Sequence, residues 1–300
     1  MTGPTAAVRK PLDMFASITT FALCIVWGMQ QVAIKAAAPA MDPVLQVGLR
    51  SFAAAILVAV FIAFARREAP IAGGTLGPGI WAALLFGSEF LVVSLGLSHT
   101  TASHMTVFLY TSPMFTAIGL HLLLPDERLR PAQWVGVLTA FAGLVVAFSA
   151  SFGASAGTST LLGDALGVLG AIFWALTTIV IRATRLEAAP AATTLLYQLI
   201  GAAVILLPLA WLHGNFSTIT FTPLLWSSLI FQAVGVAFVS YLAWFWLLRW
   251  YRATPLSMFA LLTPLFGVTF GVVLLHEPVS ARFLVGAVLV LAGIVMVSWT

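Results

Sequence analysis

The two charged residues best placed to take part in chemistry lie inside long apolar segments. Glu89 is near the middle of segment 79–97, and Arg50 lies about seven residues into segment 43–65. An ionised side chain at the centre of a membrane helix costs roughly 3 kcal/mol or more, so Glu89 must be paired, protonated or in contact with cavity water. At a rise of about 1.5 Å per residue, Glu89 and Arg50 lie at depths that agree within a few ångströms. The sequence therefore predicts either a structural Arg–Glu ion pair or a proton-coupling site.

Uncharged polar and aromatic side chains form a second candidate group. Trp27, Gln31 and Lys35 follow i, i+4, i+8 spacing and share one helix face. Trp174 and Arg182 repeat the spacing of Trp27 and Lys35 147 residues later. In lipid such polar side chains turn inward, where they either line a cavity or bond neighbouring helices, and Lys35 and Arg182 are expected to snorkel to opposite membrane faces. The predicted substrate-cavity residues are Trp27, Gln30, Gln31, Arg50, Glu89, His104, Tyr110, Trp174, Thr177, Tyr197, Gln198, Gln232, Tyr241 and Trp244.

Three further residues point to movement or titration. Pro113 and Pro264 occupy equivalent places in two apolar segments, and a proline inside a helix removes one hydrogen bond and kinks it. We predict a pair of hinges at these prolines, although duplication alone would also preserve two inert kinks. His104, at the start of the fourth apolar segment, either titrates near neutral pH or bonds a neighbour.

The composition excludes most other classes of protein. The chain is 61% hydrophobic and 7% charged, whereas a soluble domain averages roughly 25% charged residues, so its surface must face lipid. The net charge of +4 forms no continuous basic patch, which argues against a nucleic-acid partner. A single cysteine, Cys24, excludes an internal disulfide. HExxH, GxSxG, clustered acidic and nucleotide-binding motifs are all missing, so we expect no enzyme, catalytic residue, metal or cofactor.

Ten apolar segments are long enough to cross a bilayer as helices, which takes about 20 residues each. They run Phe15–Ala38, Pro43–Ala65, Gly79–Leu97, Thr101–Leu124, Pro131–Ala150, Leu162–Ile181, Ala191–Leu212, Pro223–Leu248, Ala253–Leu275 and Ala281–Trp299. The predicted fold is an all-α integral membrane protein with ten transmembrane helices.

The ten segments fall into two repeats. Residues 102–115 are echoed by residues 253–266 at an offset of 151 positions. The repeats therefore take up residues 13–150 and 162–300, with five helices each. Because five is odd, the second repeat starts on the opposite side of the membrane, and the two must be inverted about an axis in the membrane plane. Folds of this kind place a central cavity between their halves.

Lysine and arginine residues predict the orientation. Those on the side of the N-terminus are Arg9, Lys10, Arg66, Arg67, Arg128, Arg130, Arg182, Arg185, Arg249 and Arg252. The opposite side has only Lys35 and Arg282, while Arg50 lies within a span. Under the positive-inside rule both termini are cytoplasmic.

Several of these motifs resemble an EamA-type half of the drug/metabolite transporter superfamily. They are Trp27-Gly28 followed by Lys35, the Thr263-Pro264 helix, the Glu277 turn, and Gly286 with Gly293 in the last helix. The order of these motifs occurs twice and covers almost the whole chain. The resemblance implies a ten-helix carrier of the bacterial inner membrane, whose best-known relatives export amino acids and other small metabolites. Met29-Gln30 departs from the small residue and Asn that such sequences often have there.

The favoured function is secondary transport by alternating access, exporting small amphipathic metabolites such as amino acids, including aromatic ones. A carrier of cationic amines is an alternative if aromatic rings surround Glu89. A carrier of phosphorylated or nucleotide-linked sugars is a weaker one, because only Arg50 lies well inside a span. A purely structural membrane protein is a further alternative. The expected partners are a small-molecule substrate, the lipid bilayer and, if Glu89 titrates, protons; monomer and dimer are both open.

Overall fold

The computed structural model describes residues 13–65, 74–123, 129–149, 158–251 and 262–298, and no strand occurs among them. The long helices are α1 Met14–Ala37, α2 Pro43–Ala65, α3 Leu76–Leu97, α6 Pro131–Ser149, α7 Thr158–Ala183, α8 Ala191–Leu212 and α13 Ala281–Ser298. The shorter elements are α4 Ala102–Leu109, α5 Ser112–Leu123, η3 Arg185–Ala188, η4 Asn215–Thr218, α9 Pro223–Ile230, the π-helix η5 Phe231–Ser240, α10 Tyr241–Trp250 and α12 Thr263–Leu275. Apart from the start of the ninth span, the outer bounds of these elements agree with the predicted segments within a few residues.

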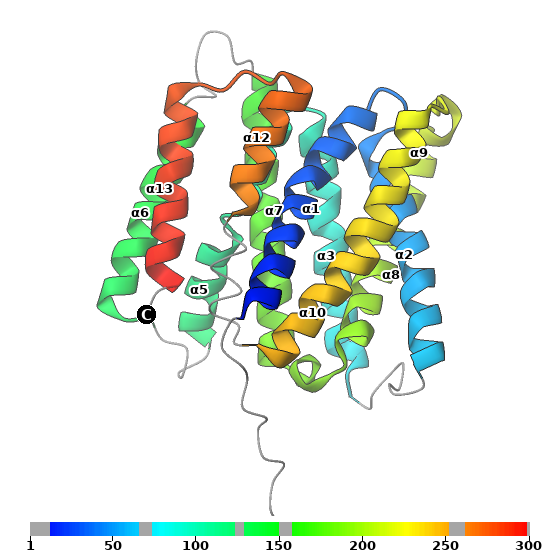
Figure 1. Cartoon of the computed structure of the whole chain (residues 1–300), viewed down its shortest axis with the longest axis horizontal. Helices are drawn as coiled ribbons and strands as arrows, with labels where there is room; N and C mark the ends of the chain where they lie inside the picture. Colours follow the sequence, from blue (N-terminus) through cyan, green and yellow to red (C-terminus); the bar gives the residue numbers. More distant parts are fainter. Residues whose placement is uncertain (1–12, 66–73, 124–128, 150–157, 252–261, 299–300) are drawn as a thin grey trace, which may run out of the picture.

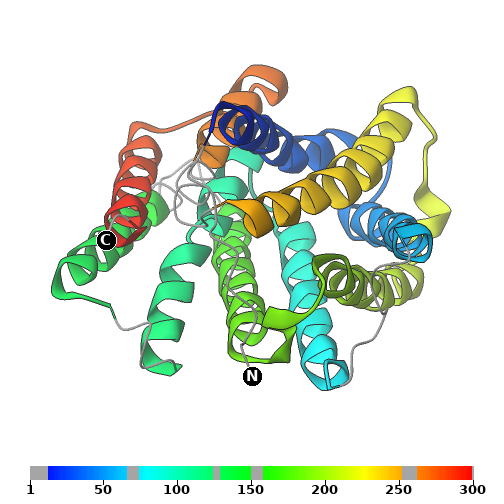
Figure 2. The same cartoon turned by 60° about the horizontal axis from the view of Figure 1, so that its bottom comes forward.

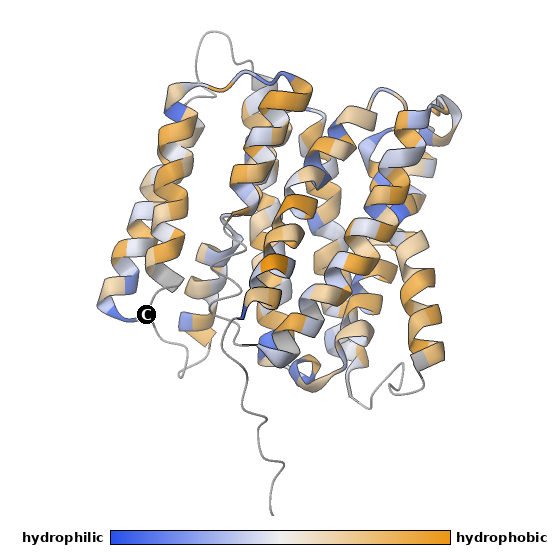
Figure 3. Cartoon of the chain, viewed as in Figure 1, coloured by the Kyte–Doolittle hydropathy of each residue, from blue (hydrophilic) through white to orange (hydrophobic). Residues whose placement is uncertain are grey.

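Length and composition make this a multi-pass membrane protein. Within the described ranges, seven helices are long and apolar enough to cross a bilayer, counting α4 with α5 and α9 with its continuation, and three shorter helices are also apolar. Large apolar side chains such as Phe52, Phe64 and Val204 are exposed. Figure 3 shows apolar residues along the helices and hydrophilic ones mainly at their ends. The outward side chains therefore match lipid rather than water.

Two of the predicted spans are interrupted. The fourth breaks at Tyr110–Thr111, between α4 and α5, and the eighth contains the ten-residue π-helix η5. The described part of the ninth is α12, because residues 253–261 of the predicted span lie outside the described ranges. In Figure 1, α12 occupies the upper half of the bundle and α5 the lower half, so both begin in its interior. Apolar patterning predicted where the spans lie but not these breaks.

The two predicted repeats are intertwined, because helices of one repeat pack mainly on helices of the other. Helix α1 packs on α12 and α3 packs on α7 and α8, while α2 packs on α8 and η5. Figure 2 shows α1 beside α12 and α3 beside α7. The interior is consequently shared by both halves of the sequence.

Small residues allow the closest of these contacts, between α6 and α13. A Cβ added to Gly143 would lie 2.5 Å from the backbone nitrogen of Val290, and one added to Gly293 would lie 2.5 Å from the carbonyl oxygen of Gly136. Membrane helices use such small residues to bring their backbones together. The Gly-rich ends of both repeats therefore form one seam.

The two ends of the bundle are named here by a residue at each. At the Met14 end, the lower end of Figure 1, α1 begins and α13 ends. At the Lys35 end, the upper end, lie the α1–α2 and α3–α4 turns and the α12–α13 connection.

Candidate functional site

A buried cation lies at the centre of the candidate site. Arg50 on α2 is only 2% exposed, and its Cζ lies 4.3 Å from the centre of the Phe90 ring on α3. The Tyr241 side chain on α10 also interacts with the guanidinium. The Nε and Nη1 atoms of Arg50 have no hydrogen-bond acceptor among the described residues. An aromatic face thus stabilises the charge while two strong donors are left without an acceptor.

Glu89 lies close enough to interact electrostatically with Arg50, Tyr110 and Tyr241. It is 4% exposed, and its Oε2 atom has no hydrogen-bond donor among the described residues. The direct Arg50–Glu89 ion pair, one of the two predicted alternatives, is not formed, since the described ranges contain no such pair within 4 Å. Helical rise fixes depth but not lateral direction, and the guanidinium turns to the Phe90 ring instead.

Aromatic side chains surround these two charges. Trp27 and Trp244 meet edge to face with ring centres 5.3 Å apart, and the Trp27 indole donates to the Ser240 hydroxyl at 2.9 Å. Tyr110, at the break between α4 and α5, meets Trp174 at the same 5.3 Å spacing. All four rings keep partly accessible surface. Tyr110 and Tyr241 also interact electrostatically with Glu89, so these rings and the two charges form one cluster.

Gln232, another of the predicted cavity residues, belongs to a structural hydrogen-bond network instead. Gln232 donates to the Gln46 side chain at 3.1 Å and to Ser228 at 2.9 Å, and Gln46 donates to the carbonyls of Ile34 and Met41. Gln46 was not among the predicted residues, although it lies one turn from Arg50. This network ties α1, α2, α9 and η5 together.

The remaining predicted residues lie in varied surroundings. Thr177 donates to the Phe173 carbonyl of its own helix, and the Tyr197 hydroxyl lies 3.5 Å from that of Thr75, at the start of α3. Gln30, Gln31 and Gln198 are buried, and Oε1 of Gln31 has no donor among the described residues.

His104 makes its contacts away from the central cluster. Its Nδ1 lies 3.0 Å from the Asp164 carboxylate on α7, and its ring stacks on Phe283 of α13 with centres 4.0 Å apart. Asp164 was not among the predicted residues. Its place inside the predicted span 162–181 was the available signal, because a carboxylate there needs a partner as much as Glu89 does.

We predicted that the two prolines kink continuous helices, and this prediction is wrong. Pro113 is the second residue of α5 and Pro264 the second of α12. Proline fits the first turn of a helix, where its missing N–H has no intrahelical acceptor to lose. Both residues therefore start new helices inside the bundle.

Lys35, which we predicted to snorkel to a membrane face, makes specific hydrogen bonds at one end of the bundle. Its ammonium donates to the carbonyl oxygens of Leu97, the last residue of α3, and of Thr100, in the α3–α4 turn. Glu277 accepts hydrogen bonds from the backbone nitrogens of Ala102 and Ser103 at 2.6 and 2.9 Å, and so caps α4. Both ends of the α3–α4 turn are therefore held by charged side chains, one from α1 and one from the α12–α13 connection.

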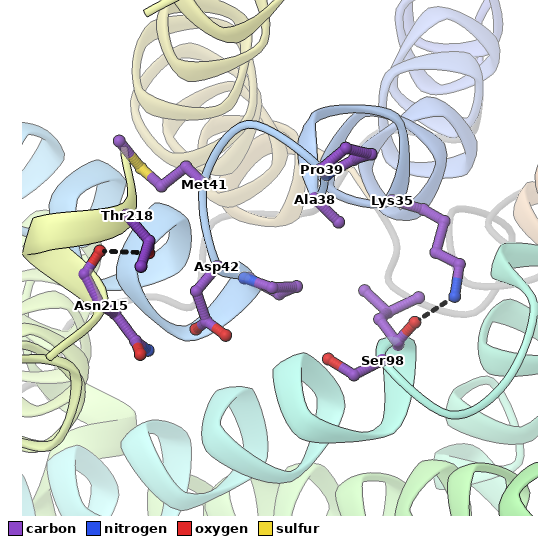
Figure 4. Close-up of a pocket in the computed structure, with 10 residues that line it drawn as sticks. Lys35, Ala38, Pro39, Met41, Asp42, Ser98, Asn215 and Thr218 are labelled. Carbon is purple, nitrogen blue, oxygen red and sulfur yellow. Dashed lines mark hydrogen bonds between the residues drawn. The ribbon is translucent and has the colours of Figure 1, made fainter. Parts of the chain in front are cut away.

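A pocket of about 420 Å³ opens beside this turn at the Lys35 end. Its lining residues are Lys35, Ala38, Pro39, Met41, Asp42, Pro43, Leu97, Ser98, Asn215 and Thr218. Figure 4 shows Lys35 and Asp42 on different sides of it. Since Lys35 already binds two carbonyl oxygens and Asp42 caps the start of α2, these charges are engaged in holding the fold.

Comparison with known proteins settles the family. A model described as the EamA-like transporter family matches residues 14–149 and again residues 161–299. The chain belongs to the EamA-like transporter family. The resemblance drawn from Trp27-Gly28, Lys35 and the later motifs is thereby confirmed.

Named relatives of this EamA-like transporter are also transporters. The uncharacterized transporter YoaV of Bacillus subtilis (strain 168) is 24% identical over 277 residues, which cover 92% of this chain and 94% of YoaV. A "probable amino-acid metabolite efflux pump" of Salmonella typhimurium is 28% identical over 279 residues, which cover 90% of each chain. The uncharacterized inner membrane transporter YedA of Escherichia coli (strain K12) is 30% identical over 174 residues, 56% of this chain and 52% of YedA. The family and these names indicate a transporter rather than an enzyme.

A solved crystal structure shares the fold of this EamA-like transporter. Its TM-score is 0.67 at 18% sequence identity, with 94% of this chain and 96% of that chain covered. An identity this low supports the common fold alone.

Proposed function

We propose that this EamA-like transporter exports small zwitterionic metabolites, foremost amino acids and including aromatic ones, by alternating access. The observation that carries the proposal is the pair of buried, opposite charges with unsatisfied atoms, Arg50 and Glu89, among aromatic rings. A substrate carboxylate would accept from the free Nε and Nη1 donors of Arg50, and a substrate ammonium would donate to the free Oε2 of Glu89.

The aromatic rings would accommodate the variable part of such a substrate. Trp27, Tyr110, Trp174 and Trp244 offer flat apolar surface that contacts aliphatic and aromatic side chains alike. Recognition would then depend on the charged amino-acid groups, while the side chain contributes non-directional contact. The amino-acid efflux names of two relatives, from Salmonella typhimurium and Escherichia coli, agree with this substrate class.

We further propose that the ten spans form two inverted repeats, residues 13–150 and 162–300, with both termini in the cytoplasm of a bacterial inner membrane. The packing supports this. In the proposed repeats α7 corresponds to α1, and α12 corresponds to α4 with α5. The contact of α1 with α12 therefore has its counterpart in the contacts of α7 with α4 and α5. Likewise α3 against α8 has its counterpart in α2 against η5. Arg130 and Arg185 flank the Met14 end, which fits a cytoplasmic assignment.

The helix starts at Pro113 and Pro264 are our candidates for the moving joints. A helix that begins inside the bundle can tilt about its free end without breaking a continuous hydrogen-bond ladder. Alternating access would then move α5 and α12 relative to the long helices α7 and α1, on which they pack.

A second candidate substrate class is a lipophilic cationic amine. Glu89 with its free Oε2, near Tyr110 and Tyr241, resembles the aromatic and acidic surroundings that suit an amine. Arg50 disfavours it, since a cationic ligand would share the site with a buried positive charge. Phosphorylated sugars are disfavoured because Arg50 is the one cation of the described central cluster.

Counterflow in proteoliposomes tests these alternatives. Purified protein would be reconstituted with unlabelled phenylalanine inside, and uptake of labelled phenylalanine would be measured against competitors. Phenylalanine methyl ester lacks the carboxylate and phenylpyruvate lacks the ammonium group, so each should compete at least about tenfold more weakly than the amino acid. If the methyl ester competes as well as phenylalanine, the cationic-amine function is favoured. If no amino acid is exchanged, the proposed substrate class is wrong.

A further inference from the structure

A second buried charged cluster lies outside the central site, at His104 and Asp164. Nδ1 of His104 lies 3.0 and 3.1 Å from the two carboxylate oxygens of Asp164, and the Thr100 hydroxyl donates to the same carboxylate at 2.5 Å. Asp164 is 0% exposed and His104 is 7% exposed. His104 and Asp164 are therefore within ion-pair distance of each other.

The pair joins helices that belong to the two proposed repeats. His104 is on α4, in the first repeat, whereas Asp164 is on α7 and the stacked ring of Phe283 is on α13, both in the second repeat. The Phe283 ring is nearly parallel to the imidazole at an interplanar angle of 6°. The pair therefore connects the two halves near the Lys35 end and is shielded there by apolar surface.

The net charge of the pair depends on a single proton. With a neutral imidazole the pair has a charge of −1, and with an imidazolium it has a charge of zero. A buried net charge is costly, because little water solvates it. The arrangement seen here, in which α4 packs against α7 and which we call closed, therefore favours the protonated pair. Histidine is the side chain that ordinarily exchanges a proton between pH 5 and 8, which makes this pair a candidate for proton binding.

Neighbouring charges on the packed elements are already engaged or lie elsewhere. The other titratable or charged groups around α4 are Lys35, Glu89, His99, His276, Glu277 and Arg282. Lys35 binds carbonyls of the α3–α4 turn and Glu277 caps α4, so these opposite charges act on the pair in opposing directions. His99 is exposed and lies 3.0 Å from the Ser159 hydroxyl, which makes it a control at the same end of the bundle.

We propose that the His104–Asp164 pair is a proton-binding site that couples protonation to closure of the Lys35 end. Binding adds one proton to the imidazole, whose Nδ1–H donates to Asp164, and neutralises the pair in the closed arrangement. Loss of the proton leaves a buried anion and favours separation of α4 from α7 and entry of water. The inference rests on the proposed alternating access, but not on the identity of the substrate.

Cysteine labelling tests the inference without any substrate. In a Cys24→Ser background, Met105→Cys places a thiol on α4 at a position that is fully buried against Gly167 of α7 in this arrangement. A membrane-impermeant maleimide would be added on the Lys35 side, and the labelling rate measured from pH 5.5 to 7.5. This interval covers the range in which histidine side chains ordinarily gain and lose a proton, so the open population should be greater at pH 7.5 than at pH 5.5.

Two variants of the pair should shift labelling in opposite directions. His104→Gln leaves Asp164 as a permanent anion and should label rapidly at both pH values. Asp164→Asn removes the anion and should label slowly at both. At each pH, comparison among the variants cancels the intrinsic pH dependence of the thiol. The unaltered pair should match Asp164→Asn at pH 5.5 and approach His104→Gln at pH 7.5, whereas His99→Gln should behave like the unaltered pair.

The outcomes separate this inference from the proposed substrate. If all four proteins have the same pH profile, the pair is a structural contact and the inference is overturned. If labelling follows the predicted pattern while phenylalanine counterflow fails, the proton site is retained and the amino-acid assignment is lost. If phenylalanine counterflow is observed but the labelling rates of the variants keep the same ratios at every pH, the amino-acid assignment is retained and the proton site is lost.

Discussion

Removing the charge of Glu89 should destabilise the protein through Arg50. In Glu89→Gln, a guanidinium that is 2% exposed and already lacks two hydrogen-bond acceptors among the described residues loses the carboxylate that attracts it. Arg50→Gln should have the reciprocal effect on Glu89. Each single change should therefore lower the free energy of unfolding.

The size of this effect follows from the separation of the charges. They are more than 4 Å apart, because no ion pair between them is formed within that distance. At an effective dielectric constant of about 20, two charges 4 Å apart attract by about 4 kcal/mol, so the greater separation makes about 2 kcal/mol a reasonable expectation. Replacing both charges should restore much of the loss, with a coupling energy of about 2 kcal/mol.

Thermal unfolding in detergent measures the coupling. In large soluble domains, a loss of about 2 kcal/mol in the free energy of unfolding lowers the unfolding temperature by roughly 4 to 8 °C, and we expect a similar shift here. Each single variant should show this shift, and the double variant Arg50→Gln/Glu89→Gln should recover most of it. Phenylalanine should stabilise the parent protein but none of the three variants, because binding uses both charges.

Glu187→Gln is the matched control for the loss of one carboxylate. Glu187 is exposed in η3 at the Met14 end, so its neutralisation should leave both stability and phenylalanine binding unchanged. Strict additivity of the Arg50 and Glu89 shifts would refute the electrostatic coupling. A stable Glu89→Gln protein with normal counterflow would remove Glu89 from the proposed site as well.

Three other expectations concern packing, movement and pH. Gly143→Leu should destabilise the α6–α13 seam by about 1–3 kcal/mol in thermal unfolding, whereas Gly77→Ala, with no described neighbour within 4 Å, should be nearly neutral. Pro113→Ala should slow counterflow more than it weakens phenylalanine binding, because α4 and α5 could then join into one stiffer helix; equal rates would make the break a passive feature. The hydrogen bond from the Tyr251 hydroxyl to Asp13 raises the pKa of Tyr251, so its stabilisation should be complete below about pH 10 and disappear as the pH rises further. Tyr251→Phe should remove that alkaline component from the pH dependence of unfolding.

Local sequence patterns were sufficient to predict the helices. Backbone groups in lipid must bond within their own segment, so each apolar run of about 20 residues becomes a helix wherever it occurs. The segment 191–212 was predicted with the bounds that the structure has, and the family followed from motifs such as Trp27-Gly28. Counting residues along a helix also placed Arg50 and Glu89 at similar depths.

The partners of the polar side chains were decided by the tertiary structure. Depth and helix face follow from the sequence, but which helix lies opposite depends on how the helices pack around one another. Arg50 therefore meets Phe90 instead of Glu89, and His104 meets Asp164, which is 60 residues away in the sequence. Apolar patterning also does not predict the break at Tyr110, because two short helices in line have the same hydrophobicity as one long helix.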